Sequence, residues 1–197
     1  MSVDPGVTSR LLTVPNVLSI VRLLLLPVFV VLLLTDRLLW AAAVLAVASL
    51  TDYLDGKIAR GYGLESRFGQ LLDPIADRLY IATTLLGLAW VGALPWWLLV
   101  VLVARDAFIL SMAPLVTRLR LPIPPVDFVG KAATFCLLGA FPLLLVGAVD
   151  GWWTAASLVV GWALTWWGTV LYWVTGLIYA WQVRDMLRQR RTTAAVR

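Results

Sequence analysis

Four aspartates lie close together in a part of the chain where apolar residues flank them on both sides. They are Asp52, Asp55, Asp73 and Asp77. An ionisable side chain at membrane depth costs roughly 2.5–3.5 kcal/mol on insertion scales, and neighbouring carboxylates also repel one another. A bound cation would offset both costs. The cluster therefore predicts a metal site rather than four independent interface charges.

The spacing of the aspartates indicates how they meet. Asp52 and Asp55 are three positions apart, and Asp73 and Asp77 are four apart, so each pair shares one face of a helix. The segment between the pairs is short, which predicts antiparallel neighbouring helices whose four carboxylates converge at the cytoplasmic membrane surface. Oxygen ligands favour Mg²⁺, Mn²⁺ or Ca²⁺ over zinc. The chain has no histidine, which excludes a histidine ligand or base.

Small and basic residues surround the aspartates. Gly56 and Ala59 follow the first pair and leave room for a ligand to approach the backbone, and Gly69 does the same before the second pair. Lys57 and Arg60 can neutralise phosphate oxygens, the arginine through a bidentate fork. A divalent metal, a phosphate and a spare carboxylate are the parts that phosphoryl transfer needs.

The composition predicts that membrane-spanning helices position these residues. The chain of 197 residues is 61% hydrophobic and 14% charged, with a mean hydropathy of +0.90, whereas soluble domains carry about 25% charged residues. At roughly 20 residues per span the length allows about six spans, and a separate soluble domain does not fit. Runs such as LLLLPVFVVLLL do not alternate, which argues against a barrel. We expect an all-α polytopic protein, one membrane domain over 1–197, with spans at 15–35, 38–60, 70–91, 96–117, 128–149 and 155–183.

The distribution of charge predicts the topology. Of the 16 Lys and Arg, only Arg37 falls in a loop on the outer side, so the positive-inside rule places both termini and the aspartate site on the cytoplasmic side of the membrane. The net charge of +5 is explained by this topology, and no nucleic-acid partner is expected. Cys136, inside an apolar run, is interpreted as a small packed hydrophobe. Six tryptophans fall at the outer ends of spans, as in an interfacial belt: Trp40, Trp90, Trp96, Trp97, Trp152 and Trp153.

The aspartates and their neighbours form a pattern that resembles the motif of the CDP-alcohol phosphotransferase family. The match is complete at eight positions: Asp52, Asp55, Gly56, Ala59, Arg60, Gly69, Asp73 and Asp77. By this resemblance, Asp52, Asp55 and Asp73 would hold two divalent metals, Mg²⁺ or Mn²⁺. Asp77 would share in metal binding and act as the base on the acceptor hydroxyl. The remaining motif residues, with Asp55, would line the cytidine diphosphate site, and the reaction would release CMP.

The acceptor alcohol is indicated by weaker signals. The segment PNVLSIVR, from Pro15 to Arg22, looks like the start of bacterial phosphatidylglycerophosphate synthases and of CDP-alcohol-type cardiolipin synthases. Both classes add glycerol-type acceptors to CDP-diacylglycerol. Arg105-Asp106 and Lys131 look more like the cardiolipin synthase branch, because the other branch usually has Arg-Glu at the first place. We therefore expect phosphatidylglycerol as acceptor, with glycerol 3-phosphate as the alternative and inositol phosphate or other alcohols less favoured.

Arg105 and Lys131 are the candidate acceptor-binding residues. A structural alternative for Arg105 is pairing with Asp106 within the bundle, although adjacent residues do not share a helix face. Intramembrane charges mark functional sites by default, so both interpretations stay open at this point. The partners expected are CDP-diacylglycerol, an alcohol acceptor and membrane lipids, and a homodimer is left open.

Two classes of non-enzymatic membrane protein are alternatives to the transferase. A small membrane transporter would place charges along a pathway and often shows inverted repeats or broken helices. Here the acidic cluster lies at one surface and no repeat is visible in the sequence. A structural or partner-binding membrane protein would explain the apolar spans but not the spacing of the aspartates. The pattern favours an enzyme.

Overall fold

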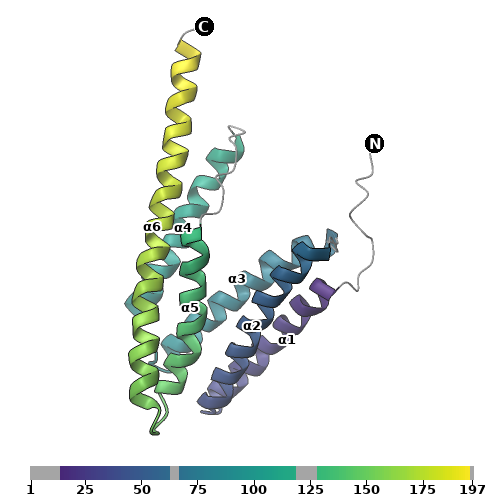
Figure 1. The fold of residues 1–197 in the computed structure, drawn as a ribbon, viewed down its shortest axis with the longest axis vertical. Coiled ribbons are helices and arrows are strands. Elements are labelled where there is room, and N and C mark those ends of the chain that lie inside the picture. Colours follow the sequence, from purple (N-terminus) through teal and green to yellow (C-terminus); the bar gives the residue numbers. More distant parts are fainter. Residues whose placement is uncertain (1–13, 63–66, 119–127, 196–197) are drawn as a thin grey trace. The chain divides into compact units, whose positions relative to one another are not determined.

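The structure is a computed structural model that describes the backbone of residues 14–62, 67–118 and 128–195, and the side chains of 20–51, 78–118 and 128–188. Within those ranges the chain forms six helices and no strand (Figure 1). The expectation of an all-helical protein is thus confirmed for the described residues. The helices are α1 (Val14–Leu34), α2 (Leu38–Tyr62), α3 (Arg67–Trp90), α4 (Trp96–Arg118), α5 (Phe128–Gly147) and α6 (Thr154–Ala195).

Five of the six helices end within about three residues of the predicted spans, and α6 is the exception. The predicted apolar span ends at residue 183, whereas the helix has 42 residues and continues to Ala195. The apolar composition stops near Val183, but no Gly or Pro follows Gly176 to break the helix. At 1.5 Å per residue α6 is about 63 Å long, roughly twice the thickness of the hydrocarbon core.

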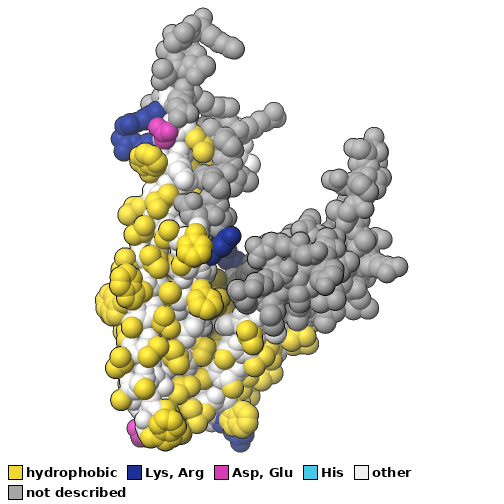
Figure 2. All heavy atoms as spheres, in the orientation of Figure 1, with side chains coloured by type: hydrophobic (Ala, Val, Ile, Leu, Met, Phe, Trp, Pro, Cys, Tyr) yellow, Lys and Arg dark blue, Asp and Glu magenta, His cyan; other side chains and the backbone are white. Residues whose placement is uncertain are grey.

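The length of the apolar helices and their exposed apolar surface indicate a membrane protein. Among the described residues, three helices are long and apolar enough to cross a bilayer, namely α4, α5 and the Thr154–Arg188 part of α6. Shorter apolar stretches lie at Ile20–Leu34 in α1 and Leu38–Thr51 in α2. Hydrophobic side chains cover most of the described part of the face seen in Figure 2. Soluble monomers rarely expose contiguous apolar surface on this scale.

The tryptophans predicted for an interfacial belt lie at helix ends, and most are exposed. Trp40 lies in the first turn of α2, Trp90 ends α3, and Trp96 and Trp97 begin α4. Their exposed fractions, and that of Trp152, lie between 52% and 90%. Trp153 differs, since it is partly buried and packs edge-on against Trp152.

The chain divides into two compact units. The first comprises residues 1–94 and 141–161, and within it α1 packs against both α2 and α3. The contact between α1 and α3 is close at Gly87. A Cβ atom at this position would lie 2.5 Å from Leu33 Cδ1 and 3.1 Å from Phe29 Cε1. Phe29 is 1% exposed, so the glycine lets a fully buried aromatic ring lie against the backbone of α3.

A defined turn folds α2 back along α1. The Arg37 N–H donates to Leu32 O (2.8 Å) and the Asp36 N–H to Leu33 O (3.1 Å), which is the Schellman pattern of a helix C-terminus. Asp36 takes the left-handed conformation that the motif requires, with φ 59°. Aspartate is one of the few non-glycine residues that adopt this conformation readily.

The second unit comprises residues 95–140 and 162–197. Its helices α5 and α6 approach closely at Gly168, where a Cβ would lie 2.8 Å from Leu137 Cγ and 3.2 Å from Cys136 Cβ. The part-buried Cys136 therefore belongs to a packed interface. Towards its C-terminal part, α6 packs against α4 through Val116 and Val183, which form a buried cluster with Tyr179 at its edge.

Candidate active site

The eight motif residues fall on two helices of the first unit. The five from Asp52 to Arg60 lie in the last part of α2, and Gly69, Asp73 and Asp77 lie in the first half of α3. The helical placement on which the spacing argument depended is thus observed. Their side chains lie outside the described residues, so the convergence of the carboxylates stays a prediction.

A polar contact joins α2 to α3 close to the aspartates. The Ser49 and Tyr80 hydroxyl oxygens are 2.9 Å apart, and the Tyr80 hydroxyl also donates to Leu45 O at 3.3 Å. Tyr80 is 6% exposed. Ser49 precedes Asp52 by three residues, and Tyr80 follows Asp77 by three. The contact therefore lies about one helical turn from both acidic pairs.

Chain connectivity makes these helices antiparallel. From Ser49 to the end of α2 at Tyr62, and from Arg67 at the start of α3 to Tyr80, the helix advances by thirteen residues, or about 20 Å. If the helices were parallel, Tyr62 and Arg67 would be roughly 40 Å apart. Five residues of chain span at most about 18 Å. Antiparallel packing alone satisfies the connection, in agreement with the sequence-based expectation.

The available ligands fit a hard divalent cation. The two helices carry four carboxylate residues, the chain has no histidine, and its one cysteine belongs to the packed α5–α6 interface. Carboxylate oxygens without nitrogen or sulfur are typical of Mg²⁺ and Mn²⁺ sites. Among the side chains that the structure describes, no three His, Cys, Asp or Glu residues are grouped to hold a metal. The α2 and α3 aspartates are therefore the candidate ligands.

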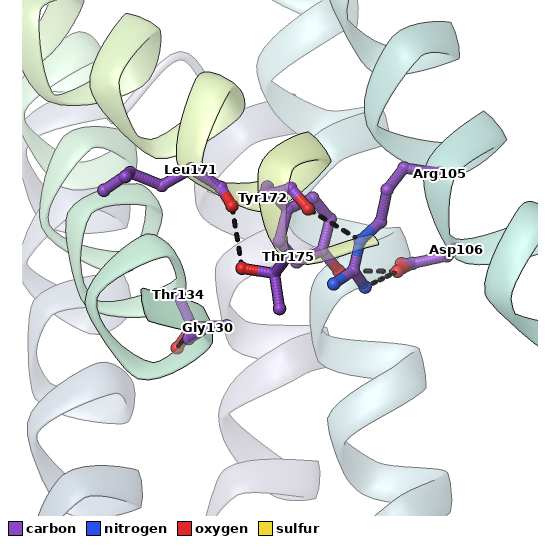
Figure 3. Close-up of polar contacts among 7 residues, drawn as sticks. All are labelled: Arg105, Asp106, Gly130, Thr134, Leu171, Tyr172 and Thr175. Carbon is purple, nitrogen blue, oxygen red and sulfur yellow. Dashed lines mark hydrogen bonds and ion pairs between the residues drawn. The ribbon is translucent and has the colours of Figure 1, made fainter. Parts of the chain in front are cut away.

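A second cluster, in the second unit, surrounds Arg105 of α4 (Figure 3). The Arg105 Nε–H donates to Tyr172 O (3.1 Å), and Nη1 forms an ion pair with Asp106 Oδ1 (3.1 Å). The Tyr172 hydroxyl donates to the same Asp106 oxygen at 2.5 Å. Pairing of Arg105 with Asp106, the structural alternative considered above, is therefore observed. Its cause is the length of the arginine side chain, which reaches a neighbour on a different helix face.

Arg105 of α4 and Lys131 of α5 lie at about the same height along α6. A Cβ at Gly176 would lie 3.5 Å from Arg105 Nε, and one at Gly130 would lie 3.2 Å from Thr175 Cγ2. Thr175 and Gly176 are consecutive in α6, so α4 and α5 meet it at the same height. Lys131 directly follows Gly130 and is exposed. The structure thus groups the two candidate acceptor residues within the second unit, while leaving their role in binding a prediction.

Sequence reasoning missed several polar residues that organise these clusters. Tyr172 lies in a run rich in Trp and Tyr, where aromatic side chains are expected to face lipid. Ser49 and Tyr80 could have been found from their spacing of three residues to Asp52 and Asp77. Arg22, the last residue of the PNVLSIVR segment, is 3% exposed. A buried arginine in an apolar helix is a candidate functional residue.

Comparisons with known proteins cover nearly the whole chain. The family model for CDP-alcohol phosphatidyltransferase matches residues 12–179, which include both clusters. A protein of Streptomyces coelicolor named cardiolipin synthase (CMP-forming) is 49% identical over 92% of this chain and 87% of its own length. A Mycobacterium tuberculosis protein named "Probable phosphatidylglycerophosphate synthase" is 33% identical over 94% and 89%. A Rickettsia typhi CDP-diacylglycerol–glycerol-3-phosphate 3-phosphatidyltransferase is 29% identical over 84% and 93%.

Proposed function

Because the chain belongs to the CDP-alcohol phosphatidyltransferase family, we propose that it transfers the phosphatidyl group of CDP-diacylglycerol to a hydroxyl of phosphatidylglycerol. A bond forms between the acceptor oxygen and the phosphatidyl phosphorus, and the bond from that phosphorus to the CMP oxygen breaks. The observation that carries the proposal is the complete eight-residue motif on α2 and α3, two neighbouring antiparallel helices. The products are cardiolipin and CMP.

Metal dependence is part of the proposal. Asp52 and Asp55 of α2 and Asp73 and Asp77 of α3 would hold two divalent ions, Mg²⁺ or Mn²⁺. When bound, such ions neutralise the pyrophosphate and stabilise charge on the leaving group. The ligand chemistry supports this assignment, because the motif supplies oxygen donors and the chain contains no histidine.

The other motif residues have roles that follow from their size and charge. Gly56, Ala59 and Gly69 have little or no side chain, which would let the cytidine diphosphate approach the two helices closely. Arg60 would hold a phosphate oxygen through its planar fork. An alcohol is a poor nucleophile near neutral pH, so a carboxylate must accept its proton. We assign that step to Asp77.

The charge around Arg105 supports phosphatidylglycerol as the acceptor. The side chains of Arg105 and Asp106 are 12% and 25% exposed and form an ion pair, so they carry little net charge together. Lys131 supplies one further positive charge at the same height along α6, within the second unit. A phosphodiester such as phosphatidylglycerol carries one negative charge, whereas a phosphate monoester carries about −1.5 to −2 near pH 7. Among the described side chains at this height of α6, Lys131 is then the cation without an acidic neighbour, and one such charge matches the phosphodiester better.

Glycerol 3-phosphate is the second candidate acceptor. The relatives from Mycobacterium tuberculosis and Rickettsia typhi bear names that refer to this chemistry, and they are similar over most of the chain. The relative from Streptomyces coelicolor has higher identity and is named for cardiolipin synthesis. The transporter alternative loses its support, since the family is one of transferases.

The proposed setting is a bacterial cytoplasmic membrane. All six helices would span it, with both termini and the α2–α3 aspartates on the cytoplasmic side. Support comes from the three long apolar helices and from the 15 Lys and Arg that lie away from the outer loops, out of 16 in all. The α6 helix, at about 63 Å, would extend well beyond the bilayer core.

The test is an assay of CMP release from CDP-diacylglycerol by the purified full-length protein in mixed micelles. Phosphatidylglycerol, glycerol 3-phosphate and inositol phosphate are offered separately, and the lipid product is analysed. We expect CMP and cardiolipin with phosphatidylglycerol. Phosphatidylglycerophosphate formed from glycerol 3-phosphate alone would establish the second candidate. No CMP with any acceptor would contradict the transferase, and an Asp73→Asn preparation controls for contaminating enzyme.

A further inference from the structure

The Ser49–Tyr80 contact lies about one helical turn from Asp52 on α2 and from Asp77 on α3, and it has no role in the family motif. We propose that it is a positioning contact, which sets the register of α2 against α3 and so places the metal ligands opposite one another. This inference rests on the proposed metal-dependent function. It concerns a different question, namely what holds the two halves of the ligand set in place.

The register follows from the spacing of residues on the two helices. In α2, positions 45, 49, 52 and 56 recur at intervals of four, three and four, and in α3 positions 73, 77, 80 and 84 do the same. Such intervals keep residues on one helix face. In an antiparallel pair where Ser49 meets Tyr80, position 52 lies opposite 77 and position 56 lies opposite 73. This register would place position 52, an aspartate, across from Asp77, and position 56, a glycine, across from Asp73.

Burial on the far side of the contact supports this register. The register pairs Leu45 of α2 with Thr84 of α3, and these residues are 1% and 0% exposed. The Tyr80 hydroxyl also bonds the Leu45 carbonyl oxygen, as expected if Leu45 and Ser49 both face α3. The next pair in the same series, Ala41 and Leu88, is also fully buried, with 0% exposure for each residue.

A hydrogen bond fixes the register of two helices better than apolar packing does. Small apolar residues such as Ala41 and Ala48 form a smooth surface, along which one helix can shift or rotate at modest cost. Loss of a hydrogen-bond partner from a buried hydroxyl costs about 1–3 kcal/mol, and the bond weakens as the two atoms move away from their best separation. A shift of one residue would move the aspartates by about 1.5 Å along the helix and 100° around it. Metal–ligand distances tolerate only about 0.2 Å.

The experiment measures Mg²⁺ dependence in the full-length protein. Tyr80→Phe keeps the ring and removes the hydroxyl. We expect the Mg²⁺ concentration for half-maximal CMP release to rise about tenfold, at the low end of the range for groups that support metal ligands. Turnover at saturating Mg²⁺ should return towards the wild-type value. Ser49→Ala should shift the requirement in the same direction by a smaller factor, because Tyr80 retains its bond to Leu45 O.

Thr84→Val is the matched control. Thr84 is 0% exposed and lies on the same face of α3, and its Oγ1 has no hydrogen-bond partner within the described structure. This change should leave the Mg²⁺ requirement at the wild-type value. Thermal unfolding in detergent shows whether each variant is folded, and a destabilised Tyr80→Phe protein can be assayed at lower temperature.

The outcomes separate this inference from the proposed function. If EDTA leaves the wild-type protein fully active, the metal-dependent function fails, and the positioning role fails with it. If the wild-type protein needs Mg²⁺ but Tyr80→Phe has the same requirement, the positioning role alone is overturned. An equal shift in Thr84→Val, or a loss of activity that Mg²⁺ does not restore, would also overturn it.

Discussion

The guanidinium carbon of Arg105 lies 3.7 Å from the centre of the Tyr172 ring, while the Tyr172 hydroxyl binds Asp106, the ion-pair partner of Arg105. The three side chains form a closed arrangement in which each restrains the other two. A cation held over an aromatic face gains about 0.5–2 kcal/mol, more as the site is desolvated. The orientation of Arg105 therefore depends on Tyr172, and an acceptor bound by Arg105 would depend on it too.

Tyr172→Phe should weaken acceptor binding more than donor binding. The change keeps the ring below Arg105 and removes the hydroxyl that holds Asp106. We expect the KM for phosphatidylglycerol to rise about three- to tenfold, or roughly 0.7–1.4 kcal/mol, with the KM for CDP-diacylglycerol unchanged. Tyr179→Phe is the control, because that ring belongs to the Val116–Val183 cluster. Similar effects of both variants would point to a general loss of packing.

Arg60 and the second-unit cations should act on different substrates. Arg60→Ala should raise the KM for CDP-diacylglycerol whichever acceptor is present, because the change removes a phosphate contact worth about 1.5–3 kcal/mol. Arg105→Ala or Lys131→Ala should instead raise the KM for the acceptor. Full kinetics with both substrates varied provide the measurement. Equal effects on donor and acceptor in all three variants would show that the division of roles is wrong.

Gly168→Ala should destabilise the α5–α6 interface. The new Cβ would lie 2.8 Å from Leu137 Cγ and 3.2 Å from Cys136 Cβ, and neither atom is the free end of a flexible side chain. Overpacking of this kind costs about 1–3 kcal/mol. Gly139→Ala, in the same interface, meets only Leu164 Cδ1 at 3.7 Å and should be tolerated. Thermal unfolding of the two variants in one detergent compares them. Equal melting temperatures would contradict the packing argument.

Much of the fold could be predicted because a long apolar segment in a bilayer has few conformations available other than a helix. Apolar runs of about 20 residues must be helical in a bilayer, and turn residues such as Asp36 and Gly92 separate them. The end of α6 could not be predicted in this way. Hydropathy marks where a helix leaves an apolar environment, and the largely polar segment 184–195 continues the helix without contributing to that signal.

The helical placement of the candidate site was predictable, because acidic residues at helical intervals indicate one helix face. The eight motif positions lie on α2 and α3 as expected, and their roles in the site stay a prediction. The contacts of Tyr80 with Ser49 and of Tyr172 with Asp106 join residues 31 and 66 positions apart. Contacts between residues so far apart in the sequence depend on how the helices pack. The hydroxyl groups of Ser and Tyr also have no distinctive sequence pattern.

Removal of divalent metal should abolish activity. Carboxylate ligands without histidine or cysteine favour hard cations, so EDTA should stop CMP release and added Mg²⁺ or Mn²⁺ should restore it. Zn²⁺ should restore it poorly, because the site offers no nitrogen or sulfur ligand. The measurement is CMP release after chelation and after each addition. Undiminished turnover in excess chelator would remove the metal from the mechanism.

Replacement of single aspartates should separate the base from the ligands. Asp77→Asn keeps the shape of the side chain and removes the proton acceptor. We expect transfer to be lost, while CDP-diacylglycerol still binds in the presence of Mg²⁺. Asp52→Asn should instead lower metal affinity, and donor binding should fall with it because the pyrophosphate is no longer neutralised. Both variants should fold, since removal of one of several repelling carboxylates relieves strain in the metal-free protein.

The decisive measurement is a Mg²⁺ titration of each variant, with donor binding and CMP release followed in parallel. Asp52→Asn should regain part of its donor binding and turnover as Mg²⁺ rises, because added metal compensates for a weakened ligand set. Asp77→Asn should bind donor and remain inactive at every concentration, because metal cannot replace a missing base. If high Mg²⁺ returned Asp77→Asn to wild-type turnover, Asp77 would be a ligand only, and another group would have to accept the proton.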